Sequence, residues 1–198
     1  MERVRLIWLP AGVTEKGLPL LARYLSPGEL SRGNRFVRHK DKLLWLSARY
    51  LTKRFVGESA SLTQNEYGKP FTEGICFNLS HDEDLTGLAL ADIPVGLDIL
   101  KEKPADKALA DYVLSEAERS SSLSLYDLLA AKEALAKAEG SGLPDDIASV
   151  PALPPEGRLI YRNCPFYRKK VPREGYHIFC CLAGSHDFLI QEEVLYEI

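Results

Sequence analysis

Long apolar runs and a surplus of basic residues are both missing from this 198-residue sequence. No apolar segment is long enough to cross a bilayer, and the apolar part of Met1–Pro10 is too short for a signal peptide. The 28 Asp and Glu residues outnumber the 25 Lys and Arg residues, so the formal net charge is −3. A general nucleic-acid-binding protein needs a basic excess to neutralise phosphates. We therefore expect a cytoplasmic protein that acts neither at a membrane nor on nucleic acid.

Cysteine is scarce and has no metal-binding pattern. The four cysteines include no C-x-x-C pair, and Cys180 and Cys181 are adjacent in an apolar run. This pattern is typical of reduced, mostly buried cysteines and argues against a structural zinc site. The sequence also has no G-x-S-x-G elbow, phosphate-binding loop or dinucleotide fingerprint. These absences argue against a serine hydrolase and against the common nucleotide-binding folds.

The remaining composition is that of an ordinary globular protein, with 45% hydrophobic and 27% charged residues. The length suffices for one large domain or two small lobes. Basic residues gather in 35–42 and 162–177. Each patch could bind a phosphorylated ligand or an acidic partner, or be a solvated surface.

Helix signals occur in both halves of the chain. Ser26–Glu29 and Ser115–Glu118 have the residues of capping boxes, and an apolar pattern predicts a long helix that continues from the first box to Phe55. Residues 106–114 also read as helical. A third strong helix is expected over 124–140, with Gly140 at its end. Strands are expected at 4–10, 75–80, 85–92, 95–100, 158–161, 176–183, 187–190 and 193–198.

The strand "VGLDIL" (Val95–Leu100) contains an aspartate among apolar residues. Alternate residues of a strand share a face, so Asp98 and Leu100 point the same way. A buried carboxylate is costly unless it is hydrogen-bonded, paired or bound to a metal. Asp98 is therefore either a metal ligand or a strand-end residue bonded to a neighbouring turn.

Two further segments have more than one interpretation. In "AAKEALAK", Glu133 and Lys137 are four residues apart and could form a surface pair, or Glu133 could be a metal ligand or general base. In "NLSHDED", Ser80 and His81 could bind phosphate oxygens and Asp82 a cation, or the segment could be a polar turn after a strand.

The order of four segments narrows these interpretations. "YGKPF", "FNLSH", "VGLDI" and "KEALAKAEGSGL" follow one another as in the 4′-phosphopantetheinyl transferases, and "LSPGEL" with a later "RF" extends the match toward the N-terminus. The chain is identified as resembling the Sfp-type, two-lobed branch of this superfamily. The resemblance implies an α+β fold of two pseudo-twofold-related lobes in one compact unit. A coenzyme A lobe (1–94) and a metal and catalytic lobe (95–198) would enclose the site, and a monomer is implied.

The resemblance also implies the reaction and the roles of particular residues. The 4′-phosphopantetheine arm of coenzyme A would pass to a serine of an acyl- or peptidyl-carrier protein in the presence of Mg²⁺, releasing 3′,5′-adenosine bisphosphate. Glu133, directly or through a water, would take the proton of the serine. By the same resemblance, Asp98 and Glu133 would bind the metal; Ser80, His81, Lys132 and Lys137 would contact coenzyme A or its pyrophosphate, with Lys137 also catalytic; and Gly68, Lys69 and Pro70 would line the adenine pocket.

The sequence departs from the family pattern at three places. Leu100 stands where the Sfp-type motif G-x-D-x-E has a second carboxylate. Either the protein is a catalytically weak paralogue that binds coenzyme A or carrier, or water or Asp82 replaces the missing ligand. Leu129 stands where these enzymes have Trp, and Leu44 and Trp45 stand where basic or hydroxylated residues are expected to meet the 3′-phosphate. Arg38, His39 and Lys42 are the candidates there, and residues 162–173 are a candidate docking patch for an acidic carrier.

Overall fold

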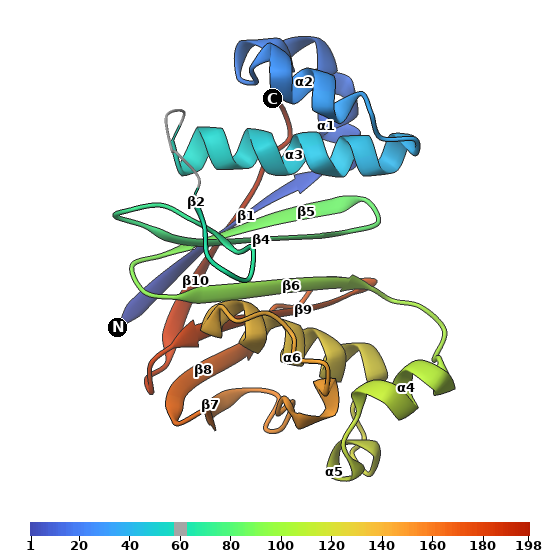
Figure 1. Cartoon of the computed structure of the whole chain (residues 1–198), viewed down its shortest axis with the longest axis vertical. Helices are drawn as coiled ribbons and strands as arrows, with labels where there is room; N and C mark the ends of the chain where they lie inside the picture. Colours follow the sequence, from blue (N-terminus) through green and yellow to red (C-terminus); the bar gives the residue numbers. More distant parts are fainter. Residues whose placement is uncertain (58–62) are drawn as a thin grey trace.

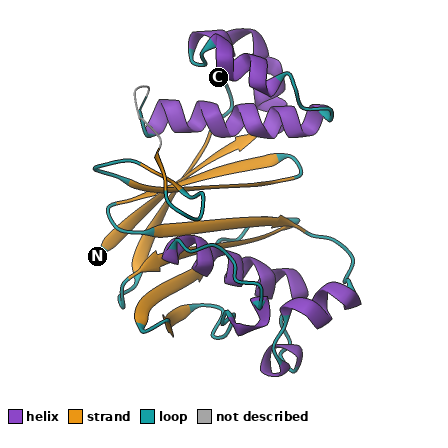
Figure 2. Cartoon of the chain, viewed as in Figure 1, coloured by secondary structure: helices purple, strands orange, loops and turns teal. Residues whose placement is uncertain are grey.

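The computed structural model of the chain describes residues 1–57 and 63–198. It is an α+β protein with two four-stranded sheets, of order β10-β1-β5-β4 and β6-β9-β8-β7, which confirms the predicted fold class (Figures 1 and 2). The main strands are β1 (Glu2–Pro10), β4 (Cys76–Asp82), β5 (Leu85–Ala91), β6 (Val95–Lys101), β7 (Gly157–Tyr161), β8 (Cys164–Lys170), β9 (Tyr176–Ala183) and β10 (Phe188–Val194). The helices are α1 (Ala11–Gly17), α2 (Pro27–Gly33), α3 (His39–Phe55), α4 (Lys107–Val113), α5 (Glu116–Arg119) and α6 (Leu125–Glu139). Short elements complete the described chain: η1 (Leu18–Arg23), η2 (Ile147–Ser149), β2 (Thr63–Gln64) and β3 (Pro70–Phe71).

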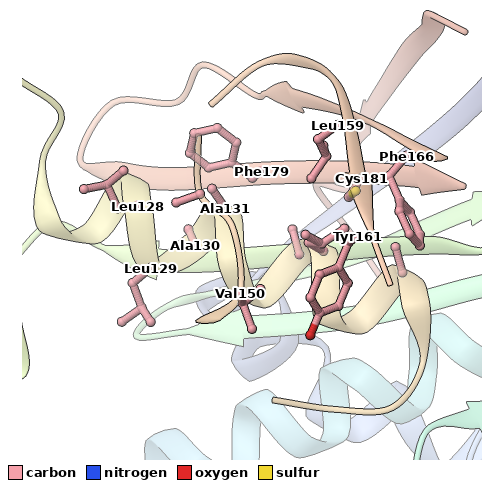
Figure 3. Packing of buried hydrophobic residues seen from close by; sticks show 14 of the residues in the cluster. Leu128, Leu129, Ala130, Ala131, Val150, Leu159, Tyr161, Phe166, Phe179 and Cys181 are labelled. Carbon is pink, nitrogen blue, oxygen red and sulfur yellow. The ribbon is translucent and has the colours of Figure 1, made fainter. Parts of the chain in front are cut away.

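The elements form four layers, with α3 on the outer face of the first sheet and α6 on the outer face of the second (Figure 1). One apolar core lies between α3 and the first sheet, and a second lies between the two sheets. The third core lies between α6 and the second sheet, and it includes Leu129, Phe179 and Cys181 (Figure 3). Leu129 therefore supplies apolar packing at the position where the Sfp-type motif has Trp.

The predicted helix boundaries hold where a local capping signal marks them. Ser26 and Ser115 each form a complete capping box, with Glu29 and Glu118 respectively. Gly140 ends α6 in the left-handed conformation, with φ of 97°, which glycine adopts without steric cost.

The single long helix expected from Ser26 to Phe55 is wrong, because the segment forms two helices. α2 ends at Gly33 and α3 begins only at His39. A Cβ at Gly33 would lie 2.9 Å from a methyl carbon of Leu46 and 3.3 Å from the ring of Trp45. The break thus lets α2 fold back against α3, with Gly33 at the close contact.

Two strand predictions also need correction. The basic segment that contains β8 was not expected to be a strand, yet it pairs with both β7 and β9. Residues 187–190 and 193–198 were expected to be separate strands, but β10 is one strand, and it pairs in parallel with β1. The C-terminal half of the chain therefore contributes a strand to the first sheet. The division into lobes at residues 94 and 95 stays a prediction.

Candidate active site

Asp98 lies in the middle of β6, and its side chain is buried, with 2% of the residue exposed. Its Oδ1 accepts hydrogen bonds from Ser80 Oγ (3.1 Å) and from Lys137 Nζ (2.5 Å). Its Oδ2 is buried and has no hydrogen-bond partner in the described part of the chain. Asp98 is therefore a carboxylate paired with Lys137 rather than one bonded to a turn. Its Oδ2 accepts no hydrogen bond from the described residues.

Gly96 explains how α6 comes so close to this carboxylate. A Cβ at Gly96 would lie 2.0 Å from the carbonyl oxygen of Ala134 and 2.4 Å from the amide nitrogen of Ala138. No side chain fits there, so only glycine allows the backbone of α6 to rest directly on β6. This contact brings Glu133 and Lys137 to Asp98.

Glu133 is the second carboxylate at the site. Burial and the negative charge of Asp98 raise the pKa of Glu133 to about 7, although the charge of Lys137 opposes the shift. Lys137 Nζ lies 3.9 Å from Glu133 Oε2, so the predicted pair exists, but it lies in the site rather than alone on the surface. The residue types present fit a divalent cation, because a cation would use the free oxygen of Asp98 and relieve the repulsion between the two carboxylates.

The segment "NLSHD" belongs to strand β4 and is not a polar turn. Alternate side chains of β4 hydrogen-bond to the backbone of β6: Asn78 Oδ1 accepts from Leu97 N (2.8 Å) and Ser80 Oγ accepts from Ile99 N (3.2 Å). Asp82 Oδ2 accepts from Lys101 N (2.8 Å). β4 and β6 are edge strands of different sheets, and these three side chains join them. We call Asn78, Ser80 and Asp82 the β4 rungs.

The expected metal-binding role of Asp82 competes with this structural one. Its Oδ1 accepts from the amide of Glu83 (2.9 Å), and its Oδ2 also accepts from Lys103 Nζ (3.3 Å). A cation would have to share or replace these bonds. Among the residues described, no three His, Cys, Asp or Glu side chains form a group suited to hold a metal ion. Metal binding by Asp82 stays a prediction.

His81 follows Ser80 on β4 and is exposed. Partial desolvation and the positive charge of Lys137 lower the pKa of His81. The imidazole is therefore close enough to the site to sense Lys137, as a phosphate-binding role would require.

The loop with Gly68, Lys69 and Pro70 is fixed to the C-terminal end of α6. Lys69 Nζ donates to the carbonyl oxygens of Lys137 (2.5 Å) and Val95 (3.3 Å). Together with Asn78 and Lys137, the three loop residues line a cavity of about 230 Å³. The sequence-predicted loop thus adjoins the carboxylate site.

Three of the predicted ligand contacts, Lys132, Arg38 and His39, lie elsewhere. Lys132 is completely buried and forms an ion pair with Glu118 (2.8 Å). Its Nζ also donates to the carbonyl oxygens of residues 147, 148 and 150, at 3.2, 3.3 and 2.6 Å. Lys132 therefore holds segment 147–150 in place, and its amino group has no N–H left to donate to a phosphate. Arg38 and His39 are exposed at the start of α3, and His39 contacts Glu15.

A larger hollow, of about 610 Å³, was not anticipated from the sequence. Trp45, Pro70 and Leu79 supply apolar surface, and Arg32 supplies positive charge. Arg49 also lines the hollow, but it is paired there with Glu29 (2.6 Å). Neither Arg38 nor His39 is among its lining residues. Leu79 precedes Ser80 on β4, so the hollow reaches the strand that carries the site. Arg32 lies in α2 and Arg49 in α3, and only the packing of the two helices brings these arginines to one hollow.

The basic segment 162–173 is not a continuous positive surface. Arg168 is completely buried and donates to backbone carbonyl oxygens, including that of Ala131 (2.9 Å). Lys169 pairs with Asp187 (2.6 Å) and Lys170 with Asp127 (2.8 Å). Most of the charge is therefore neutralised within the protein.

The described helices include none that is both long and apolar enough to cross a membrane. No family model matches the chain. Among individual proteins, it is 30% identical over 177 residues to the 4′-phosphopantetheinyl transferase gsp of Aneurinibacillus migulanus, covering 76% of this chain and 73% of that protein. It is 28% identical over 203 residues to the 4′-phosphopantetheinyl transferase ffp of Bacillus subtilis, covering 89% and 90%. A similar match, 28% over 186 residues and 81% and 83% of the two chains, is found with Sfp of Bacillus subtilis (strain 168).

These similarities, together with the fold, define the class of protein: the chain belongs to the 4′-phosphopantetheinyl transferase family and is a transferase. Its relatives place it in the Sfp-type branch of that family.

Proposed function

We propose that the protein transfers the phosphopantetheine arm of coenzyme A to a serine of an acyl- or peptidyl-carrier protein, with Mg²⁺. The observation that carries the proposal is the convergence of Asp98, Glu133, Lys137 and Ser80 from three elements at one buried site. Such an arrangement suits a substrate that carries several negative charges and a cation.

Asp98, Glu133 and Lys137 each have a task in the proposed reaction. Asp98 and Glu133 would hold Mg²⁺, which prefers a few carboxylates, substrate oxygens and waters to a complete protein cage. The bound cation would offset the negative charge that develops on the leaving phosphate. Lys137 and His81 would bind pyrophosphate oxygens, and Lys137 would stabilise the departing 3′,5′-adenosine bisphosphate. Glu133, with its raised pKa, is suited either to the cation or to the serine proton.

The hollow beneath α2 and α3 supports the coenzyme A part of the proposal. Its apolar residues Trp45, Pro70 and Leu79 suit an adenine ring, and Arg32 suits a phosphate, which Arg49 could also bind if it shared its contact with Glu29. Binding there would direct the rest of the coenzyme along β4 toward Asp98. Arg32 and Arg49 are better placed for the nucleotide phosphate than Arg38 and His39.

Leu100 supports an alternative, a weak paralogue that binds coenzyme A or carrier without efficient transfer. Its side chain packs against the core beneath α6, so the second carboxylate of the Sfp-type motif G-x-D-x-E has no equivalent on this face of β6. An acidic side chain elsewhere or a water would have to complete the coordination.

The test is incubation of the protein with coenzyme A, Mg²⁺ and several apo-carrier proteins, followed by mass spectrometry of the carrier. We expect the carrier to gain the mass of phosphopantetheine, and Asp98→Ala or Glu133→Ala to abolish the gain while the fold stays intact. Glu174→Ala, which changes an exposed acid, is the matched control and should transfer normally. No gain with any carrier, beside an active reference enzyme, would favour the binding alternative; wild-type rates in either site variant would show that the metal site is misplaced.

A further inference from the structure

The C-terminal end of α6 is held by a short turn from the first half of the chain. The last carbonyl groups of a helix have no partner within the helix itself. In α6 the carbonyl oxygen of Lys137 accepts from Lys69 Nζ (2.5 Å), and that of Gly140, just beyond the helix, accepts from Asn65 Nδ2 (2.8 Å). The ammonium of Lys69 also lies at the end of the helix that carries partial negative charge, which is stabilising. The turn thus caps α6 across 68 and 75 residues of sequence.

Asn65 gives this turn its shape. Its Oδ1 accepts from the backbone amides of Tyr67 (3.1 Å) and Lys69 (2.8 Å), and its own backbone amide donates to the carbonyl oxygen of Lys69 (3.0 Å). The side-chain oxygen of Asn65 therefore closes the turn, while the side-chain nitrogen holds Gly140. Because these bonds fix the backbone of Lys69, its side chain starts from a defined position beside α6.

The residue that the turn holds is also the cation of the carboxylate site. Lys137 Nζ donates to Asp98 Oδ1 (2.5 Å) and to Ser80 Oγ (3.2 Å), while the carbonyl oxygen of the same residue is bonded to Lys69. Lys69 Nζ donates in addition to the carbonyl oxygen of Val95 (3.3 Å), which lies on β6, the strand that carries Asp98. The turn therefore joins the end of α6 to the strand of the metal-binding carboxylate.

We propose that Asn65 is a positioning residue: it holds the last turn of α6, directly and through Lys69, so that Lys137 reaches Asp98 and the pyrophosphate. This inference rests on the proposed function, in which Lys137 stabilises the departing nucleotide. In the described part of the chain, Asn65 lines neither the hollow of about 610 Å³ nor the cavity of about 230 Å³. Asn65 therefore acts on the rate through Lys137, and a shift of about 1 Å in a catalytic group can cost a factor of about 100.

A simpler explanation is that Asn65 only closes its own turn. Asn65→Asp separates the two explanations, because it keeps an acceptor for the amides of Tyr67 and Lys69 but removes the donor to Gly140. The new oxygen would face the carbonyl oxygen of Gly140 and add a negative charge at the negative end of α6. If closing the turn is the whole role of Asn65, the variant should behave as wild type.

The experiment measures transfer to an apo-carrier by wild type, Asn65→Asp, Lys137→Met and the double variant. Asn163→Asp, the same change at an exposed asparagine, is the control and should match wild type. For Asn65→Asp we expect kcat to fall about 10-fold, with KM for coenzyme A within about 2-fold of wild type. In the Lys137→Met background, the same change should alter kcat by less than about 2-fold, because the effects of residues that act through one another are not additive.

The outcomes separate the inference from the proposed function. An undiminished kcat in Asn65→Asp, with an active wild type, would overturn the inference alone. An equal fall in both backgrounds would do the same, because Asn65 would then act on something other than Lys137. No transfer by wild type would overturn the proposed function and the inference with it.

A second measurement needs no turnover and decides the question if Lys137→Met is inactive. Labelling with a small acylating reagent, read by mass spectrometry, should modify Lys137 faster in Asn65→Asp than in wild type, because the amine is less often paired with Asp98. Amide hydrogen exchange should become faster at Gly140, at the end of α6, and stay unchanged at Ala131, in its middle. Unchanged labelling of Lys137 would overturn the inference, whatever the rate of transfer.

Discussion

At the scale of single residues, the site is distinguished by which side chains lie together, not by rare residue types. Asp98, Glu133 and Lys137 are common residues, and the sequence also allowed a turn-bonded Asp98 and a surface pair of Glu133 with Lys137. The structure places all three together, and the buried Oδ2 of Asp98 has no hydrogen-bond partner among the described residues. Leu100 is the residue at which this chain differs most from the motif it resembles.

Leu100→Glu should restore a third carboxylate on this face of β6. We expect half-maximal transfer at a lower Mg²⁺ concentration, because a third anionic oxygen strengthens cation binding. Without Mg²⁺ the variant should be about 1–3 kcal/mol less stable, since a half-buried apolar contact is replaced by a charge.

Leu100→Gln is the matched control, because it has a similar size and no charge. Its Mg²⁺ titration should stay close to that of wild type. If the Mg²⁺ dependence of transfer is the same in Leu100→Glu and Leu100→Gln, then residue 100 does not stand at a ligand position that water fills in wild type. A failure of both to fold would show that Leu100 is needed only for the core.

At the scale of elements, local signals identified the ends of helices better than they identified strands. Capping residues act within one turn, so Ser26, Ser115 and Gly140 could be recognised from their neighbours alone. Strand β8 could not, because its basic residues resemble a solvated loop until Arg168 meets the carbonyl oxygens around it. The β4 rungs could not be predicted from the sequence either, because their side chains accept hydrogen bonds from backbone amides of β6, which belongs to the other sheet.

The β4 rungs should contribute measurably to stability. In Asn78→Ala the buried amide of Leu97 loses its acceptor, and we expect a loss of about 1–3 kcal/mol in the free energy of unfolding. Denaturant titration measures this loss, and amide hydrogen exchange should become faster at Leu97 and Ile99. Asn34→Ala changes an exposed asparagine and should stay within about 0.5 kcal/mol of wild type. Equal stability of the two variants would mean that water replaces the rung.

The contact between α2 and α3 should make stability depend on pH in acid. Glu29 accepts from Arg49 (2.6 Å) and pairs with Lys53 (2.8 Å). Burial raises the pKa of Glu29, but these cations and the capping bonds of Ser26 lower it from 4.5 to about 2. A carboxyl with a depressed pKa stabilises the fold fully above its unfolded value, and the contribution disappears as the pH falls from about 4.5 to about 2.

Glu29→Gln tests this pH dependence. At pH 6 the variant should be less stable than wild type by roughly 1–3 kcal/mol, and the difference should vanish near pH 2. Urea unfolding across this range measures both proteins, and Glu174→Gln, at an exposed acid, should follow wild type throughout. A constant difference at all pH values would mean that the size of the side chain, not its charge, matters.

At the scale of the whole molecule, the site belongs to no single part of the chain. Ser80 comes from the first sheet, Asp98 from the second, and Glu133 and Lys137 from the helix on its outer face. Sequence order indicated which segments matter, because the four motifs occur in the family's order. It could not indicate that Lys132 turns into the core while Lys137 reaches Asp98, because that depends on the angle at which α6 lies on the sheet.

Gly96 is not one of the site residues, but Gly96→Ala should still disable the site. The added Cβ cannot coexist with the Ala134 carbonyl at 2.0 Å, so α6 must move away from β6. We expect a loss of at least about 3 kcal/mol in the free energy of unfolding, at the upper end of overpacking effects, and little or no transfer in whatever fraction folds. Gly12→Ala is the control, because nothing lies within 4 Å of a Cβ there and alanine favours helix α1. Normal stability and transfer in Gly96→Ala would mean that the close contact of α6 with β6 does not hold Glu133 and Lys137 at Asp98.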